Sequence, residues 1–254
     1  MQLNYQTYGK GSPLIVLHGL FGMLDNWHSV GKMLGEYFQV FLVDQRNHGR
    51  SPHSAEMDYE AMARDILEFS TQHRIPTFHL LGHSMGGKVA MKTALSFPGS
   101  VEKLIVIDIA PRLYPSFHDS ILNAMTSIDL KNFSTRQAVD GALSVAIHEQ
   151  PVRQFLMKNL ARNEDDSFRW KLNLPVIALK YQNMLEEVKS STPYSKPTLF
   201  IRSKKSSYIG EGDIPHIKRL FPDSTFTDFE TGHWVHAEAP ELLVKTVVDF
   251  LLRT

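Results

Sequence analysis

The fold is decided by one stretch of sequence, Phe78-His79-Leu80-Leu81-Gly82-His83-Ser84-Met85-Gly86-Gly87-Lys88. Its first four residues form a short apolar run, and a helical pattern occupies residues 88–97. A Gly-x-Ser-x-Gly motif between a strand and a helix is typical of a nucleophile elbow. The turn is so tight that side chains at the two glycine positions would collide with the neighbouring elements. The stretch therefore predicts that Ser84 is a nucleophile held at the edge of a sheet.

Similar apolar runs recur on both sides of this stretch. Each is typical of a strand buried on both faces of a parallel sheet. These runs cover residues 14–17, 40–43, 104–107, 198–201 and 225–229. Helical patterns at residues 59–72 and 240–252 complete an alternation of strands and helices. This alternation predicts the α/β class with right-handed crossovers.

The strand pattern stops between the two halves of the predicted sheet. Four segments there have helical patterns, namely residues 120–128, 135–147, 152–160 and 174–187. We expect residues 113–192 to form an all-helical cap over a core made of residues 1–112 and 193–254. Open parallel sheets bind ligands at their carboxyl edge, and long insertions there commonly act as lids. The alternative is a surface excursion without function.

His233 is the predicted general base. In folds with a nucleophile elbow, the catalytic residues follow the order Ser, acid, His, and the histidine lies after the last strand. Of the twelve histidines, only His216, His233 and His236 lie late enough. His216 falls inside a helical pattern, and His236 begins the turn toward the last helix. The order therefore favours His233.

The acid is harder to place. No carboxylate follows the strand at residues 198–201, where the fold usually carries one; the next is Asp213, at an expected helix start. Asp108 ends the preceding strand pattern, and a carboxylate at the buried tip of a strand requires a partner. We therefore expect Asp108 to be the acid, with Asp213 as the alternative.

Two further groups of residues complete the predicted site. The loop after residues 14–17 and the residue after the nucleophile usually supply backbone N–H groups to the oxyanion hole, here those of Leu20 and Met85. His18 is expected to brace that loop. Bulky side chains beside these motifs predict a narrow apolar substrate pocket. Its expected lining residues are Phe21, Trp27, Phe155 and Trp234.

The polar run from Asp44 to Pro52 resembles a catalytic motif, but we interpret it as structural. We expect Asp44 and Arg46 to pair and hold the loop after a strand. Asn47 and Gly49 are residue types that tolerate a positive φ angle, which such a loop requires.

The composition excludes several classes of protein. The 254 residues contain 27 acidic and 27 Lys or Arg residues, so no net field favours nucleic acid. There are no cysteines, which excludes disulfides, thiolate metal sites and a cysteine nucleophile. No secretory signal pattern and no long apolar run occur. We expect a cytoplasmic protein with no cofactor, no metal and no membrane span.

The motifs as a set are familiar. His18-Gly19-Leu20-Phe21-Gly22, Gly82 to Lys88, Asp108-Ile109-Ala110-Pro111 and Gly232-His233-Trp234-Val235-His236 resemble those of the YbfF-like small acyl-esterase family, with its mitochondrial abhydrolase-domain relatives. The resemblance implies an α/β-hydrolase fold and hydrolysis of short acyl esters or acyl thioesters. It also implies Ser84, Asp108 and His233 as catalytic residues, with Ser206 supporting the acid.

Other functions remain open at this point. A hydrolase of carbon–carbon bonds, acting on ring-cleavage products, and a cofactor-free perhydrolase would use the same fold and triad. A non-catalytic binding module would be expected to lack one triad member, whereas this chain has a candidate for each role. Dehalogenases and epoxide hydrolases need a carboxylate nucleophile, and position 84 is serine. The pattern leaves the oligomeric state undetermined.

Overall fold

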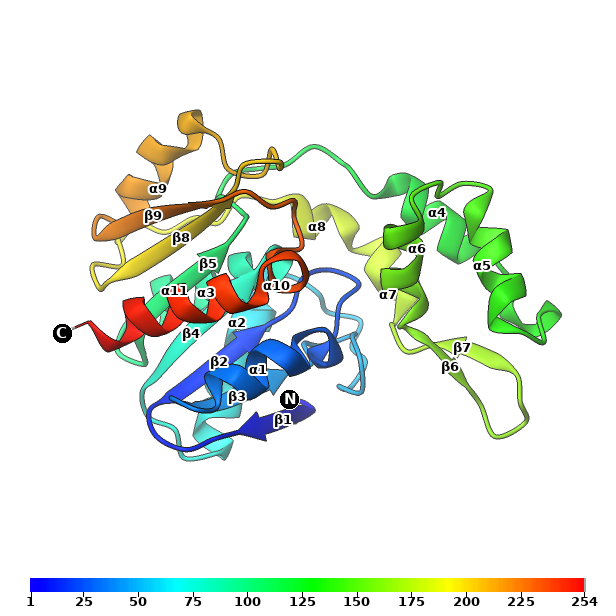
Figure 1. Cartoon of the computed structure of the whole chain (residues 1–254), viewed down its shortest axis with the longest axis horizontal. Coiled ribbons are helices and arrows are strands. Elements are labelled where there is room, and N and C mark those ends of the chain that lie inside the picture. Colours follow the sequence, from blue (N-terminus) through cyan, green and yellow to red (C-terminus); the bar gives the residue numbers. More distant parts are fainter. Residues whose placement is uncertain (254) are drawn as a thin grey trace.

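The computed structural model describes residues 1–253 and contains one large, mostly parallel sheet (Figure 1). Its strand order is β1-β3-β2-β4-β5-β8-β9, and only the pairing of edge strand β1 with β3 is antiparallel. The strands are β1 (Tyr5–Tyr8), β2 (Pro13–Leu17), β3 (Gln39–Val43), β4 (Phe78–His83), β5 (Val101–Ile107), β8 (Thr198–Ser203) and β9 (Ser224–Phe229). The predicted α/β fold is confirmed, and β1 is a strand that the apolar pattern did not reveal.

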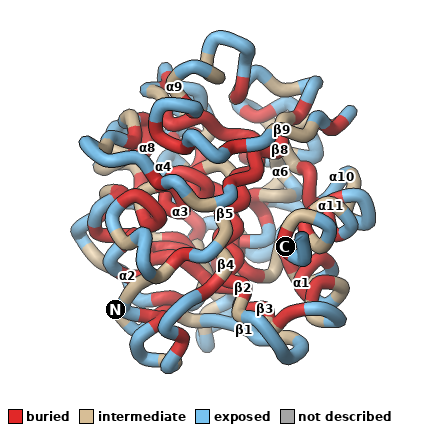
Figure 2. Tube along the Cα trace, turned by 90° about the vertical axis from the view of Figure 1, so that its left-hand side faces the viewer, coloured by how far each residue is buried: buried red, intermediate tan, exposed pale blue. Residues whose placement is uncertain are grey.

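Helices cover both faces of the sheet, which explains why its central strands are apolar throughout. Alternate side chains of a strand point to opposite faces. Ile15 and Leu17 thus join one hydrophobic cluster, while Leu14 and Val16 join the other. Figure 2 shows the central strands as buried. The flanking elements are η1 (Leu24–Trp27), α1 (His28–Leu34), α2 (Tyr59–Gln72), α3 (Met85–Ser96), η3 (Glu211–Asp213), α9 (Ile214–Leu220), α10 (Val235–Glu238) and α11 (Pro240–Leu252).

The segment between β5 and β8 stands apart from the sheet, and we call it the cap segment (residues 113–192; Figure 1). It contains α4 (Asp119–Ser127), η2 (Leu130–Asn132), α5 (Arg136–Ser144), α6 (Gln150–Met157), β6 (Leu160–Arg162), β7 (Phe168–Trp170), α7 (Leu174–Leu179) and α8 (Tyr181–Leu185). None of the helices within residues 1–253 combines the length and apolar character of a membrane span.

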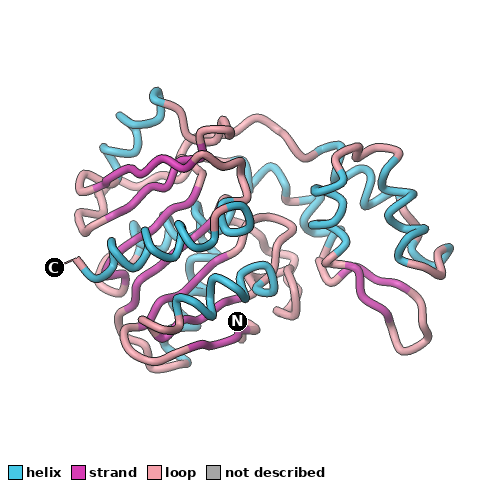
Figure 3. Tube along the Cα trace, in the orientation of Figure 1, coloured by secondary structure: helices cyan, strands magenta, loops and turns pink. Residues whose placement is uncertain are grey.

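The expectation of an all-helical cap was wrong in one place, and one expected helix is divided in two. A small antiparallel hairpin, β6 with β7, follows α6 (Figure 3). Its strands are three residues long, too short to show a period of two. Asp166 closes the hairpin loop with a φ of 65°, which aspartate tolerates. The helix expected at residues 174–187 is also divided into α7 and α8, with Lys180 between them.

Candidate active site

Ser84 lies in a strained turn between β4 and α3. Its φ and ψ are 54° and −121°, so the backbone occupies a region that residues with a side chain rarely adopt. A Cβ atom on Gly82 would lie 2.1 Å from the carbonyl oxygen of Gly86, and one on Gly86 would lie 2.5 Å from that of His18. The glycines of the motif are therefore required by contact with backbone. The serine N–H donates to the carbonyl of Ile107 at 3.0 Å, which fixes the turn to β5.

The backbone N–H groups of Leu20 and Met85 are free to receive an anion. Met85 is the first residue of α3, where the helix dipole is positive and N–H groups lack intrahelical acceptors. Within residues 1–253 neither N–H has an intramolecular acceptor. The loop that carries Leu20 is held from the cap segment, because Asn159 Nδ2 donates to the carbonyl of Phe21 at 2.7 Å. Both N–H groups therefore remain available as hydrogen-bond donors to a ligand.

His18 braces the same loop as a neutral side chain. Its Nδ1 contacts the carbonyl of Gly19 at 2.8 Å, and its Nε2 accepts from the N–H of Gln45 at 3.1 Å. This pattern requires the proton on Nδ1. Burial lowers the pKa of His18 to about 4. Its role is therefore structural, as the sequence indicated.

The structure brings His233 and Asp108 together at the carboxyl edge of the sheet. His233 Nδ1 lies 2.8 Å from Asp108 Oδ2. Asp108 follows β5, is fully buried and has a φ of 50°. Its other oxygen, Oδ1, accepts from the N–H of Ser203 at 3.1 Å. A buried carboxylate needs such partners, and here it has one on each oxygen.

The alternative acid, Asp213, is engaged elsewhere. Its Oδ1 lies 2.9 Å from Arg112 Nε, and its Oδ2 accepts from the N–H of Gly210 at 2.8 Å. Asp213 ends η3 and immediately precedes α9, so it lies at a helix start, as expected.

Ser206 does not make the expected contact with Asp108. Its Oγ accepts from the N–H of Tyr208 at 3.2 Å, and its own N–H donates to the carbonyl of Ser203 at 3.1 Å. The chain turns tightly after β8, so the backbone N–H of Ser203 reaches the carboxylate while the Ser206 hydroxyl closes the turn. The backbone N–H of Ser203, and not the hydroxyl of Ser206, is therefore a hydrogen-bond donor to Asp108, and a backbone donor cannot be recognised from the type of side chain.

Two aromatic rings contact the imidazole of His233, and the sequence motifs predicted neither contact. Tyr208 stacks on it with ring centroids 4.1 Å apart and planes 19° apart. The ring centroid of His83 lies 4.7 Å from that of His233 with the planes tilted by 43°, and His83 Nε2 donates to the carbonyl of His233 at 2.8 Å. Burial and the neighbouring His233 and His236 hold the pKa of His83 well below its usual range. His233 is thus held through its ring, its Nδ1 and its backbone carbonyl.

A cavity of about 140 Å³ opens beside Ser84 and His233. All four predicted pocket residues, Phe21, Trp27, Phe155 and Trp234, line it, and the rings of Phe155 and Trp234 lie 5.5 Å apart. Ile121 and Val152 of the cap segment complete the apolar wall. The cap segment therefore contributes directly to the site.

A second, smaller cavity of about 30 Å³ meets the first at Ser84. It lies toward α2 and α3, and Met85, Ile109 and Met184 are among its lining residues. The buried Lys88 also lines it and donates to the carbonyl of Leu185 at 3.1 Å. Burial lowers the pKa of Lys88 to about 7.

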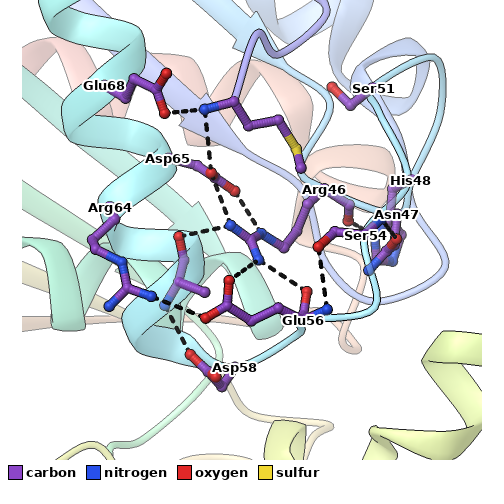
Figure 4. A network of polar contacts seen from close by, with 12 residues as sticks. Arg46, Asn47, His48, Ser51, Ser54, Glu56, Asp58, Arg64, Asp65 and Glu68 are labelled. Carbon is purple, nitrogen blue, oxygen red and sulfur yellow. Dashed lines mark hydrogen bonds and ion pairs between the residues drawn. The ribbon is translucent and has the colours of Figure 1, made fainter.

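The polar loop after β3 is structural, but its pairing differs from the expected one (Figure 4). Arg46 binds Asp65 of α2 through Nε at 2.6 Å and through Nη2 at 2.9 Å. Asp44 instead accepts three N–H groups, those of Leu24, Arg50 and the Asn4 side chain. The arginine stem is long enough to reach the next helix, while the carboxylate is saturated by nearby donors.

The remaining details of this loop match the expectations. Asn47 and Gly49 have φ angles of 65° and 58°. Asn173 of the cap segment donates its side-chain amide N–H to Asn47 Oδ1 at 3.0 Å, so the loop also anchors the cap segment.

Within residues 1–253, no group of three or more His, Cys, Asp or Glu side chains is arranged to hold a metal ion.

Comparisons with known proteins agree with this geometry. The family model described as alpha/beta hydrolase fold matches residues 12–240. The sn-1-specific diacylglycerol lipase ABHD11 of Danio rerio is 38% identical over 99% of this chain and 83% of its own length. Esterase YbfF of Escherichia coli is 33% identical over 97% of this chain and 95% of its own. A solved structure titled "Marine microorganism esterase" is 41% identical, with a TM-score of 0.96, and the match covers 98% of this chain and 99% of that one.

Proposed function

The chain belongs to the alpha/beta hydrolase fold family and is a serine hydrolase of the carboxylic ester class, and from this premise we propose that it hydrolyses short to medium acyl esters through a Ser84–His233–Asp108 triad. The observation that supports the triad is the 2.8 Å contact between His233 Nδ1 and the buried Asp108, beside the cavity that Ser84 lines. That contact leaves His233 Nε2 as the nitrogen for proton transfer.

The proposed reaction begins at Ser84. Its Oγ bonds to the carbonyl carbon of the ester while its proton moves to His233 Nε2. The carbonyl oxygen becomes negative and accepts from the N–H groups of Leu20 and Met85. Each such donor is typically worth about 3–4 kcal/mol to the transition state. The bond to the alcohol oxygen then breaks, and that oxygen takes the proton from His233.

Water completes the cycle. It gives a proton to His233 Nε2 and attacks the acyl-enzyme, the bond to Ser84 Oγ breaks, and Oγ recovers the proton. Asp108 stabilises the imidazolium in both steps and keeps the Nδ1 proton in place. The same steps would release a thiol from an acyl thioester, which we include as a second substrate class.

The proposal is tested with Ser84→Ala. Loss of the nucleophile should reduce kcat for p-nitrophenyl acetate by on the order of 10⁶-fold and should abolish labelling by a fluorophosphonate. Ser206→Ala is the matched control, because it removes a serine from the same sheet edge, and it should label normally. Labelling that persists in Ser84→Ala would rule out this nucleophile. A carbon–carbon bond hydrolase or a perhydrolase would show itself by turnover of a ring-cleavage dienoate or by peroxide-dependent halogenation in the same series.

A further inference from the structure

The two cavities beside Ser84 differ in size and in what lines them. They share Ser84, Leu20 and His118, so they meet where the reacting carbonyl group must lie. The larger cavity holds about 140 Å³ and the smaller about 30 Å³. An ester has two substituents on its carbonyl carbon that need space, the acyl chain and the alcohol. The structure therefore offers one cavity for each.

The chemistry of the proposed function decides which substituent enters which cavity. The alcohol oxygen receives its proton from His233, so the alcohol must leave on the side of the imidazole. Of these two cavities beside Ser84, the larger is lined by His233 and its neighbour Trp234, and the smaller is not. The carbonyl oxygen points to the N–H groups of Leu20 and Met85. The acyl chain is left to extend past the Met85 side chain, into the smaller cavity.

The walls of the smaller cavity are fixed by hydrogen bonds. Tyr59 donates its hydroxyl to the carbonyl of Met184 at 2.7 Å, and Lys88 holds the carbonyl of Leu185. Tyr114 accepts from the N–H of Ala110 at 2.8 Å and also donates to the carbonyl of Tyr208. Widening the cavity by moving these walls would break hydrogen bonds between buried groups, and each would be costly to leave unmade.

We propose that the smaller cavity binds the acyl chain and the larger one the alcohol, so that the substrates are acetyl to butyryl esters of bulkier, apolar alcohols. This inference rests on the proposed function and narrows it. A water-sized group needs about 10–15 Å³ of cavity volume. The smaller cavity, at about 30 Å³, therefore accommodates about two to three carbon atoms beyond the carbonyl group. The larger cavity, walled by Trp27, Phe155 and Trp234, has room for an aromatic or branched alcohol.

Two substrate series test the assignment. In one, the alcohol stays p-nitrophenol and the acyl chain grows from acetyl to decanoyl. In the other, the acyl group stays acetyl and the alcohol grows from methanol to naphthylmethanol. For the wild-type enzyme, kcat/KM should fall at least tenfold from butyryl to hexanoyl, whereas the acetates should improve or stay level as the alcohol grows. Each methylene group that is newly accommodated should contribute up to roughly fourfold.

Variants of each cavity then separate the two roles. Met184→Ala enlarges the smaller cavity and should shift the acyl optimum by at least two carbons while leaving the order of the acetates as in the wild type. Ile121→Ala enlarges the larger cavity and should do the opposite. Ile109→Val, a smaller change on the acyl side, should act in the same direction as Met184→Ala and provides the test if that variant unfolds. Thermal unfolding of each variant identifies such a loss of fold.

The contrary outcomes are distinct. A rise in kcat/KM through octanoyl esters in the wild type, or an acyl optimum that moves with Ile121→Ala and not with Met184→Ala or Ile109→Val, would place the acyl chain in the larger cavity and overturn the inference. That result would leave the proposed function unaffected if activity still depends on Ser84. Activity that does not depend on Ser84 would instead overturn the proposed function and this inference together.

Discussion

β5 and β8 are neighbouring parallel strands, with Ile107 paired to Ile201, yet their carboxyl ends carry different chemistry. The end of β5 bends into a positive φ at Asp108 and carries the buried carboxylate. The end of β8 carries no carboxylate; it supplies the N–H of Ser203 to Asp108, and its following turn places the ring of Tyr208 on His233. Residues that follow both strands therefore reach His233, so a carboxylate could contact the histidine from either strand end, and in this chain it comes from β5.

Removing the charge at the β5 end should have the largest effect on activity. Asp108→Asn keeps the size of the side chain but lacks the charge that stabilises the imidazolium, and it disturbs the Nδ1 tautomer. We expect kcat to fall by on the order of 10³–10⁴, as it does when a triad acid is lost. Steady-state kinetics on p-nitrophenyl acetate measure this.

Asp213→Asn is the matched control for that variant. It removes a carboxylate near the β8 end that contacts Arg112 and Gly210 and has no contact with His233 within residues 1–253. Its kcat should stay near that of the wild type. The assignment of the acid to β5 fails if Asp213→Asn loses the activity and Asp108→Asn keeps it.

A third strand end, that of β2, differs from both because the buried titratable group that follows it, His18, is held neutral. Burial lowers the pKa of His18 from its ordinary value of 6.5 to about 4 in the folded protein. Between these values the unfolded chain binds more protons, so the contribution of His18 to stability is present above pH 6.5 and is lost as the pH falls toward 4. The shift corresponds to about 3 kcal/mol.

Urea unfolding across that pH window measures the effect. The free energy of unfolding of the wild type should fall with pH, and His18→Gln should flatten part of the fall. Burial also lowers the pKa of His48, His118 and His236, to about 3, 4 and 3, so some slope should remain. A pH dependence identical in wild type and variant would show that His18 is not held neutral by the fold.

The sequence predicted those parts of the site that depend on backbone geometry and chain order. The glycines around a tight turn predicted where Ser84 lies, and the position after the last strand selected His233. The need of a buried carboxylate for a partner selected Asp108, which the structure places 2.8 Å from His233. The α/β fold was predicted from apolar runs, which occur because the central strands are buried on both faces of the sheet.

The parts that could not be predicted depend on where a flexible or short segment runs. Stacking of Tyr208 on His233 needs the path of the turn after β8, which residue types do not encode. Arg46 was expected to bind the nearby Asp44 and instead reaches Asp65, because a long side chain can bypass its neighbours in sequence. The three-residue strands β6 and β7 are too short for a pattern to register.

A smaller effect is expected from the ring that the β8 end provides. Tyr208→Leu removes the stacking on His233, and such aromatic pairs contribute about 0.5–1.5 kcal/mol beyond their buried area. We expect kcat for acetyl esters and the rate of fluorophosphonate labelling to fall roughly two- to tenfold. Tyr208→Phe keeps the ring and should restore both rates. If Phe and Leu at this position give equal labelling rates, the ring does not position the base.

The smallest effect is expected from Ser206, which stands where the fold usually carries its acid. Ser206 Oγ accepts from the N–H of Tyr208 and has no contact with Asp108 within residues 1–253. Ser206→Ala therefore removes one partly buried hydrogen bond within the turn, worth about 1 kcal/mol of stability, and leaves both partners of Asp108 in place. We expect kcat within about twofold of the wild type, together with a small decrease in Tm. A loss of tenfold or more in kcat, with Tm unchanged, would instead mean that the hydroxyl turns toward Asp108 during catalysis and that both strand ends share the role of the acid.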